Sequence, residues 1–96
     1  MKRYRIVFTG QVTGVGFRFT LMMIARELQL TGYVRNLSRD HVEAEVQGER
    51  VHLFIKEALK RQGFAQIEDY AVKEIEPVEE ETAFTVRYSD GSGRLR

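Results

Sequence analysis

Segments with strand-like and helix-like patterns of hydrophobic residues follow one another along the chain, separated by short polar or glycine-containing breaks. Period-two alternation or a continuous β-type run predicts strands over residues 4–9, 32–36, 42–47, 67–75 and 84–88. Apolar residues recur at steps of three and four from Phe17 to about Leu30, and again from Val51 to Leu59. These two stripes predict amphipathic helices, and Gly63 is expected to close the second one.

The predicted order of elements is strand, helix, strand, strand, helix, strand, with a further short strand at the end. Two helices of this length do not cover both faces of so small a sheet, so both are expected on one face. The pattern therefore predicts an α+β protein with the ferredoxin-like split βαβ sandwich (βαββαβ), in which an antiparallel sheet carries two helices on one face. We expect one domain over residues 1–90 and a flexible C-terminal tail over residues 91–96.

Composition excludes several classes of site and partner. The chain has 96 residues, 43% of them hydrophobic, and no cysteine, so disulfides and thiolate metal sites are ruled out. No apolar run is long enough for a signal peptide or a membrane span, and we expect a soluble, cytoplasmic protein. A net charge of +1 argues against a strongly basic nucleic-acid surface.

The segment Gly10–Arg18, with the sequence Gly-Gln-Val-Thr-Gly-Val-Gly-Phe-Arg, is the strongest candidate for a functional site. It holds three glycines within seven positions, directly after a predicted strand and directly before a predicted helix. Such a loop can wrap backbone amides around an anion, to which the first N–H groups of the helix add. Arg18 brings a permanently charged planar guanidinium suited to phosphate oxygens. We interpret the loop as a phosphate cradle, although a glycine-rich turn is also ordinary punctuation when taken alone.

Asn36 is the second candidate. It ends the predicted strand over residues 32–36, which leaves the first helix and runs in the same sheet as the strand before the glycine-rich loop. This arrangement allows Asn36 to approach the mouth of that loop. Taken alone, an asparagine at a strand end is most often a turn former.

Three stretches of the chain together resemble the acylphosphatase family. The loop Gly10–Arg18 looks like the phosphate-binding signature of that family, for which Val-Gln-Gly-Val-Gly-Phe-Arg is typical. The stretch Gly-Tyr-Val-Arg-Asn at 32–36 looks like the second signature, and Val42-Glu43 followed by Gln47-Gly48 fits a third in spacing and type. The resemblance covers nearly the whole chain and its order of elements. Two signatures at the correct spacing are far more specific than one glycine-rich loop.

The resemblance implies an acylphosphatase, which hydrolyses the carboxyl–phosphate bond of an acyl phosphate to a carboxylate and inorganic phosphate without metal or cofactor. It implies two catalytic residues, Arg18 to hold phosphoryl oxygens and Asn36 to position the attacking water. The phosphate-binding loop that it implies consists of Thr13, Gly14, Val15, Gly16, Phe17 and Arg18. No carboxylate–histidine pair is visible as a general base, and we hypothesise that a phosphate oxygen of the substrate takes the proton of the water.

The chain departs from the family pattern at several positions. Thr13 stands in place of the usual glutamine, Arg39-Asp40 in place of Asp-Gly, and Gln29 where glycine is frequent near the end of the first helix. The change at Thr13 is mild if the position contributes its backbone N–H, and it lowers activity if the side chain matters. Asp40 can adopt a left-handed conformation at some energetic cost, so the turn is expected to survive with lower stability.

Two alternatives to an enzyme remain open on the sequence. The first is a regulatory module of the same fold that binds an anion or an acyl phosphate without turnover. The second is an RNA-binding sheet, which is disfavoured because Glu43, Glu45 and Gln47 are expected on a solvated face that would repel phosphates. His41 and His52 have no partner at metal-ligand spacing. We therefore expect a monomer that binds an acyl phosphate as substrate and phosphate as product, with no metal, nucleic-acid or membrane partner.

Overall fold

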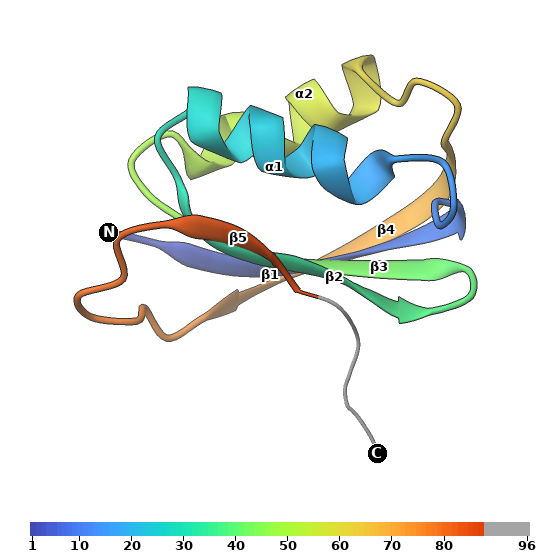
Figure 1. Cartoon of the computed structure of the whole chain (residues 1–96). Coiled ribbons are helices and arrows are strands. Elements are labelled where there is room, and N and C mark those ends of the chain that lie inside the picture. The colour runs from blue at the N-terminus through green and yellow to red at the C-terminus, as the bar shows by residue number, and fades with distance from the viewer. Residues whose placement is uncertain (88–96) are drawn as a thin grey trace.

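In the computed structural model, which describes residues 1–87, five strands form one sheet and two helices pack on one of its faces (Figure 1). The elements are, in order, β1 (Arg3–Gln11), α1 (Phe17–Glu27), β2 (Thr31–Ser38), β3 (His41–Gln47), the 3₁₀ turn η1 (Val51–Leu53), α2 (Phe54–Lys60), β4 (Gln66–Ile75) and β5 (Phe84–Arg87). This order and the two layers confirm the predicted ferredoxin-like α+β fold. The predicted tail over residues 91–96 lies outside the described residues.

The strands lie in the order β4-β1-β3-β2-β5, and all neighbours are antiparallel except β2 and β5, which are parallel. The sheet is therefore mixed rather than wholly antiparallel as expected, because the chain leaves β4 at one edge and returns along the free side of β2. β1 and β2 both pair antiparallel with β3, so they run in the same direction. Thr9 and Ser38 both lie opposite His41, so the C-terminal ends of β1 and β2 lie at the same end of the sheet.

The hydrophobic core lies between the helices and the side of the sheet that they cover. Its members include Ile6, Phe8, Phe17, Leu21, Ile24, Val34, Val42, Ala44, Val46, Phe54 and Phe84, all nearly inaccessible to solvent. Phe17, the first residue of α1, packs edge-on against Phe8 of β1 with the ring centroids 5.4 Å apart. This aromatic contact holds the start of α1, and with it the end of the glycine-rich loop, over the sheet.

The first helix ends at Glu27, three residues before the predicted end near Leu30. The cause is Gln29, whose backbone has a positive φ of 59°. The N–H of Leu30 then donates to the carbonyl of Ala25 at 2.8 Å, as in a Schellman motif. Glycine usually occupies this left-handed position and so marks the end of a helix in a sequence. Because Gln29 stands there instead, the sequence did not indicate where the helix ends.

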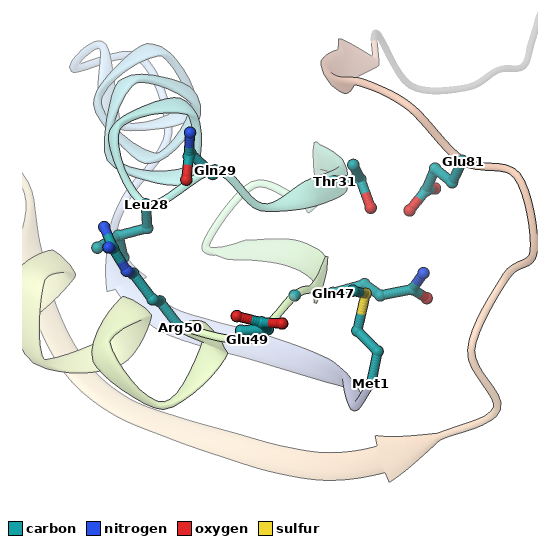
Figure 2. Close-up of a pocket in the computed structure, with 9 residues that line it drawn as sticks. Met1, Leu28, Gln29, Thr31, Gln47, Glu49, Arg50 and Glu81 are labelled. Carbon is teal, nitrogen blue, oxygen red and sulfur yellow. The ribbon is translucent and has the colours of Figure 1, made fainter.

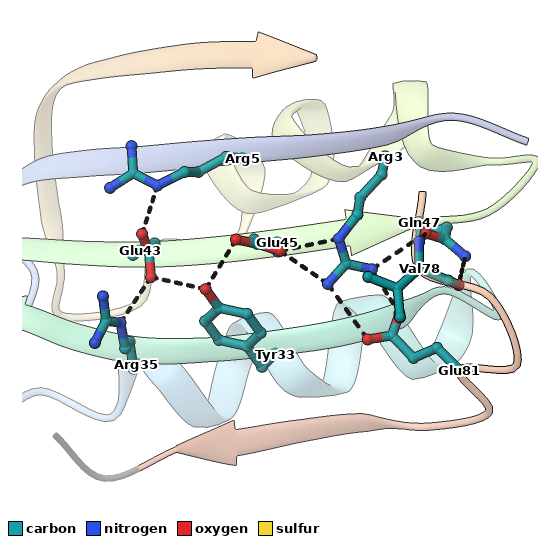
Figure 3. A network of polar contacts seen from close by, with 9 residues as sticks. All are labelled: Arg3, Arg5, Tyr33, Arg35, Glu43, Glu45, Gln47, Val78 and Glu81. Carbon is teal, nitrogen blue, oxygen red and sulfur yellow. Dashed lines mark hydrogen bonds and ion pairs between the residues drawn. The ribbon is translucent and has the colours of Figure 1, made fainter. Parts of the chain in front are cut away.

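The face of the sheet turned away from the helices is covered by arginine side chains (Figure 3). Glu43 is only 2% exposed and Gln47 only 7%, so the prediction that they lie on a solvated face is wrong. Glu43 accepts hydrogen bonds from Nε of Arg5 at 2.5 Å, from Nε of Arg35 at 2.7 Å and from the hydroxyl of Tyr33 at 3.0 Å. The hydrocarbon stems of the arginines exclude water from the carboxylate while their charges neutralise it.

A second group on the same face surrounds Arg3, which is itself 2% exposed. Its guanidinium donates to the carboxylates of Glu45 at 2.9 Å and Glu81 at 2.7 Å and to the amide oxygen of Gln47 at 3.2 Å. The hydroxyl of Tyr33 also lies 2.9 Å from Glu45, so its single proton is shared between the carboxylates of Glu43 and Glu45 and connects the two groups (Figure 3). Because arginines pair with these carboxylates, this face does not repel phosphates in the way that the sequence suggested. The near-neutral net charge remains the reason to expect no nucleic-acid partner.

Glu43→Gln is expected to lower the free energy of unfolding by about 2 kcal/mol at pH 7, because it removes a buried charge from two arginines. Arg5 and Arg35 are more than a third exposed, which keeps the loss below that of a fully buried pair. Burial raises the pKa of the Glu43 carboxyl, but the hydrogen bonds from Arg35, Arg5 and Tyr33 outweigh burial and hold that pKa below its usual range.

The contribution of Glu43 is therefore present above the ordinary glutamate pKa of about 4.3 and is lost as the pH falls through the lowered value. Urea unfolding of wild type and Glu43→Gln at pH 7 and at about pH 3 checks this, since the difference between them should shrink in acid. Glu57→Gln, which alters an exposed helix pair with Arg61, is the control and should change stability far less. An equal difference at both pH values would contradict the role given to the charge.

Candidate active site

The loop between β1 and α1 turns through two left-handed glycines. Gly14 has a φ of 72° and Gly16 a φ of 78°. A side-chain carbon built at either position would meet no atom within 4 Å, so backbone conformation rather than space favours glycine there. Gly16 directly precedes Phe17, and no side chain caps the helix. The N-terminus of α1 is therefore open toward the loop.

The backbone amides of this loop are available to bind an anion. The hydrogen bond that starts the helix runs from the N–H of Thr20 to the carbonyl of Gly16 at 3.1 Å. Within residues 1–87, no acceptor pairs with the N–H groups of residues 14–17. Unpaired N–H groups at a helix start carry partial positive charge and are a common binding site for phosphate-like anions.

Arg18 lies in the first turn of α1, next to these amides. Its Nη1 donates to the backbone carbonyl of Arg87 in β5 at 3.4 Å, a long hydrogen bond that orients the guanidinium. Arginine stays charged and offers a planar set of donors, so this position adds a full positive charge to the partial charges of the helix start.

Asn36 lies in β2 opposite Val42 of β3, directly before a break in the strand register. Its side-chain oxygen Oδ1 is buried, and no hydrogen-bond donor among the described residues reaches it. A buried oxygen left without a partner costs about 1–3 kcal/mol, so such an atom in a native protein is normally satisfied by an ordered water or a ligand. The Asn36 carboxamide is therefore prepared for a donor that the described part of the chain does not supply.

One pocket brings the two predicted catalytic residues together. Its volume is about 170 Å³. It is lined by Val12, Gly14, Gly16, Phe17, Arg18, Phe19, Asn36 and Val86. Arg18, Asn36 and most of the predicted loop thus border the same small space, whereas Thr13 and Val15 do not line it.

Three of the residues that line this pocket were not predicted from the sequence as site residues. Val12 directly follows β1 and lies within the segment Gly10–Arg18, but it precedes residues 13–18, to which phosphate binding was assigned. Phe19 lies one residue beyond the loop motif, where nothing in the hydrophobic pattern separates it from an ordinary helix residue. Val86 enters through β5, whose position beside β2 depends on a pairing between distant segments. The apolar side of the pocket therefore depends on the three-dimensional fold and was not predictable from the sequence alone.

Thr13, which replaces the usual glutamine, uses its side chain rather than only its backbone. Its hydroxyl donates to the backbone carbonyl of Arg39 in the turn between β2 and β3. Beside it, the N–H of Gly10 donates to the carbonyl of Asp40 at 3.0 Å. These two bonds tie the glycine-rich loop to the hairpin whose first strand carries Asn36.

The turn of this hairpin forms at Asp40 without a glycine. Apart from glycines, only Gln29 and Glu80 have a positive φ among residues 1–87, so Asp40 does not use the left-handed conformation that aspartate can adopt. Its carboxylate instead lies 2.9 Å from Nδ1 of His41 and accepts a hydrogen bond from the hydroxyl of Ser38 at 3.2 Å. These contacts, with His41 the larger, hold the pKa of Asp40 below its usual range. The side-chain bonds support the turn in place of glycine.

A larger pocket of about 280 Å³ lies near the opposite end of β1, where Gln47 and Thr31 pair with each other (Figure 2). Glu49, Arg50 and Glu81 contribute charged groups to its lining. None of the predicted site residues borders it. The predicted chemistry therefore belongs to the smaller pocket at the start of α1.

Metal-binding clusters and membrane-spanning helices are both absent from residues 1–87. No cluster of three histidine, aspartate or glutamate side chains has the arrangement of a metal site in this part of the chain. No helix of the described chain has the length and hydropathy needed to cross a membrane.

A family model and several known proteins match most of this chain. The family model for acylphosphatase matches residues 4–86. An acylphosphatase from Clostridium beijerinckii is 38% identical over 90 residues, which are 92% of this chain and 100% of the relative. An acylphosphatase from Caldivirga maquilingensis is 43% identical over 89 residues, with 90% of this chain and 94% of the relative covered. The crystal structure of acylphosphatase from Bacillus subtilis has a TM-score of 0.85 at 31% identity and covers 92% of this chain and 100% of its own.

These matches extend over the sheet, both helices and the glycine-rich loop, so they concern the whole fold and not a single motif. They favour an enzyme over the non-catalytic module and the RNA-binding sheet that the sequence left open. The chain belongs to the acylphosphatase family, whose members hydrolyse the carboxyl–phosphate bond of acyl phosphates.

Proposed function

We propose that the pocket at the start of α1 is the site where this chain hydrolyses acyl phosphates, with residues 13–18 around the phosphoryl group and with Arg18 and Asn36 as catalytic residues. One observation supports this most strongly. Arg18 and the buried, unpartnered Oδ1 of Asn36 border the same pocket, next to backbone amides that have no acceptor in residues 1–87. The positively charged donors suit an anionic phosphoryl group, and the Oδ1 acceptor of Asn36 suits a water molecule in the same pocket.

The loop amides and Arg18 stabilise the charge of the transferring phosphoryl group. In phosphoryl transfer, negative charge spreads over the equatorial oxygens, and catalysis consists mainly of positioning and electrostatic stabilisation. The N–H groups of residues 14–17 and the guanidinium of Arg18 are donors held in place before the substrate arrives. A preorganised donor of this kind is worth about a hundred- to a thousandfold in rate.

Asn36 positions the attacking water. The water donates one hydrogen bond to Oδ1 of Asn36, which satisfies the buried oxygen and aims the lone pair of the water at phosphorus. The new P–O bond forms as the bond from phosphorus to the acyl oxygen breaks, and the leaving group departs as a carboxylate. The proton of the water passes to a phosphoryl oxygen of the substrate, so no side chain has to act as a base.

The reaction is expected to need no divalent cation, because Arg18 and the helix start supply the positive charge. Hydrolysis of benzoyl phosphate by the purified protein should proceed at the same rate in the presence and absence of EDTA, and inorganic phosphate should inhibit competitively. Loss of activity in EDTA that added Mg²⁺ restores would contradict this proposal, as would phosphate inhibition that excess substrate does not relieve.

The oligomeric state of the protein, its location and its lack of a nucleic-acid partner remain predictions from the sequence. We expect a monomer in the cytoplasm, and the net charge of +1 supports the absence of a nucleic-acid partner.

A further inference from the structure

An exposed phenylalanine lies at the edge of the pocket beside Arg18. Phe19 is 59% exposed, although it follows Arg18 directly in the first turn of α1. A single exposed apolar side chain is common on protein surfaces and carries no meaning by itself. Phe19 differs because it lines the same pocket as Arg18 and Asn36, together with Val86 of β5.

The pocket therefore has two chemically different sides. Gly14, Gly16 and Arg18 contribute the donors that suit a phosphoryl group. Phe19 and Val86 contribute apolar surface, and Arg18 is the one charged residue among the described residues that line the pocket. A substrate whose phosphoryl group lies against the donors has the remainder of its structure beside this apolar surface.

We infer that Phe19 and Val86 form the acyl-binding side of the pocket and select acyl phosphates with a small, uncharged and preferably aromatic acyl group. This inference rests on the proposed function of the pocket. An aromatic acyl group stacks on the exposed ring of Phe19, and its contact removes apolar surface from water on both partners.

Size and charge narrow the substrate class further. A volume of about 170 Å³ lies below the roughly 300 Å³ at which pockets for drug-sized ligands begin, so a long acyl chain is not enclosed. An acyl group that carries a second carboxylate would lose water against Phe19 and Val86, where the described lining offers no second cation. The expected order of kcat/KM is benzoyl phosphate first, acetyl phosphate second and succinyl phosphate last.

Phe19→Ala tests the inference. We expect kcat/KM for benzoyl phosphate to fall roughly tenfold and kcat/KM for acetyl phosphate to fall by less than about twofold, because acetyl has little surface to lose. The inhibition constant of inorganic phosphate should stay unchanged, since phosphate has no acyl group. Phe19→Leu should give an intermediate loss for benzoyl phosphate. Phe64→Ala is the matched control, because Phe64 is 87% exposed and lies in the loop before β4, away from the pocket lining.

Each result bears on the inference. Unequal losses for the two substrates, with an unchanged phosphate inhibition constant, support it. Equal losses for benzoyl and acetyl phosphate, no loss for either, or a wild type that prefers succinyl phosphate would overturn it. Failure of the proposed function has a different signature, in which Arg18→Ala retains wild-type rates on every acyl phosphate tested.

Discussion

Arg18→Ala is expected to lower kcat/KM for benzoyl phosphate by about a hundred- to a thousandfold while the fold persists. The variant removes the one full positive charge in the described pocket lining and leaves the backbone amides of the loop in place. Because the lost interaction strengthens as charge develops on the phosphoryl group, most of the loss should fall on kcat. Steady-state hydrolysis together with circular dichroism of the purified variant provides the measurement.

Arg26→Ala is the matched control for this experiment. Arg26 lies on the same helix and donates to the carbonyl of Phe84 in β5 at 3.1 Å, much as Arg18 donates to Arg87. It therefore shares the tie between α1 and β5 but does not line the pocket. Near-wild-type rates for Arg26→Ala alongside a large loss for Arg18→Ala would assign the effect to the charge in the site. Comparable losses for both variants would mean that the helix–strand contact, and not chemistry, explains the result.

Asn36→Ala is expected to lower kcat by about ten- to a hundredfold and to leave the inhibition constant of inorganic phosphate within about twofold of wild type. The proposed mechanism assigns the positioning of water to the carboxamide and the binding of the phosphoryl oxygens to the loop and Arg18. Thermal stability should change little, because Oδ1 of Asn36 makes no hydrogen bond to the described residues. Kinetics, phosphate inhibition and the melting temperature are measured on the same preparation.

This combination separates a role in catalysis from a role in folding. A residue kept for the hairpin would lower the melting temperature when removed and leave kcat nearly unchanged. A residue that binds phosphate would raise the inhibition constant as much as it lowers kcat. Either outcome would contradict the positioning of water by Asn36.

The order of elements and the approach of Arg18 to Asn36 follow from the sequence for a clear reason. β1 and β2 both pair antiparallel with β3, so the loop after β1 and the C-terminal end of β2 must lie at the same end of the sheet. The hydrophobic periods predict these strands, and the three glycines predict the loop between them. Local pattern and simple topology were sufficient for this part of the site.

Other features depend on contacts between distant residues and were not predictable in the same way. The burial of Glu43 arises from Arg5 and Arg35 on the two neighbouring strands, whereas the alternation within β3 alone indicates a solvated face. Val86 reaches the pocket because β5 adds parallel to β2 after a long return from the other edge. The hydrogen bond from Thr13 to the hairpin is likewise invisible to a motif that compares residue types.

The most direct test of the site is a crystal structure of the protein with bound phosphate or vanadate. We predict that the anion lies within hydrogen-bonding distance of the amides of residues 14–17 and of the Arg18 guanidinium, with Oδ1 of Asn36 accepting a hydrogen bond from a water or from the apical oxygen of vanadate. An anion bound elsewhere in the molecule, or one in this pocket from which Arg18 and Asn36 both turn away, would contradict the account.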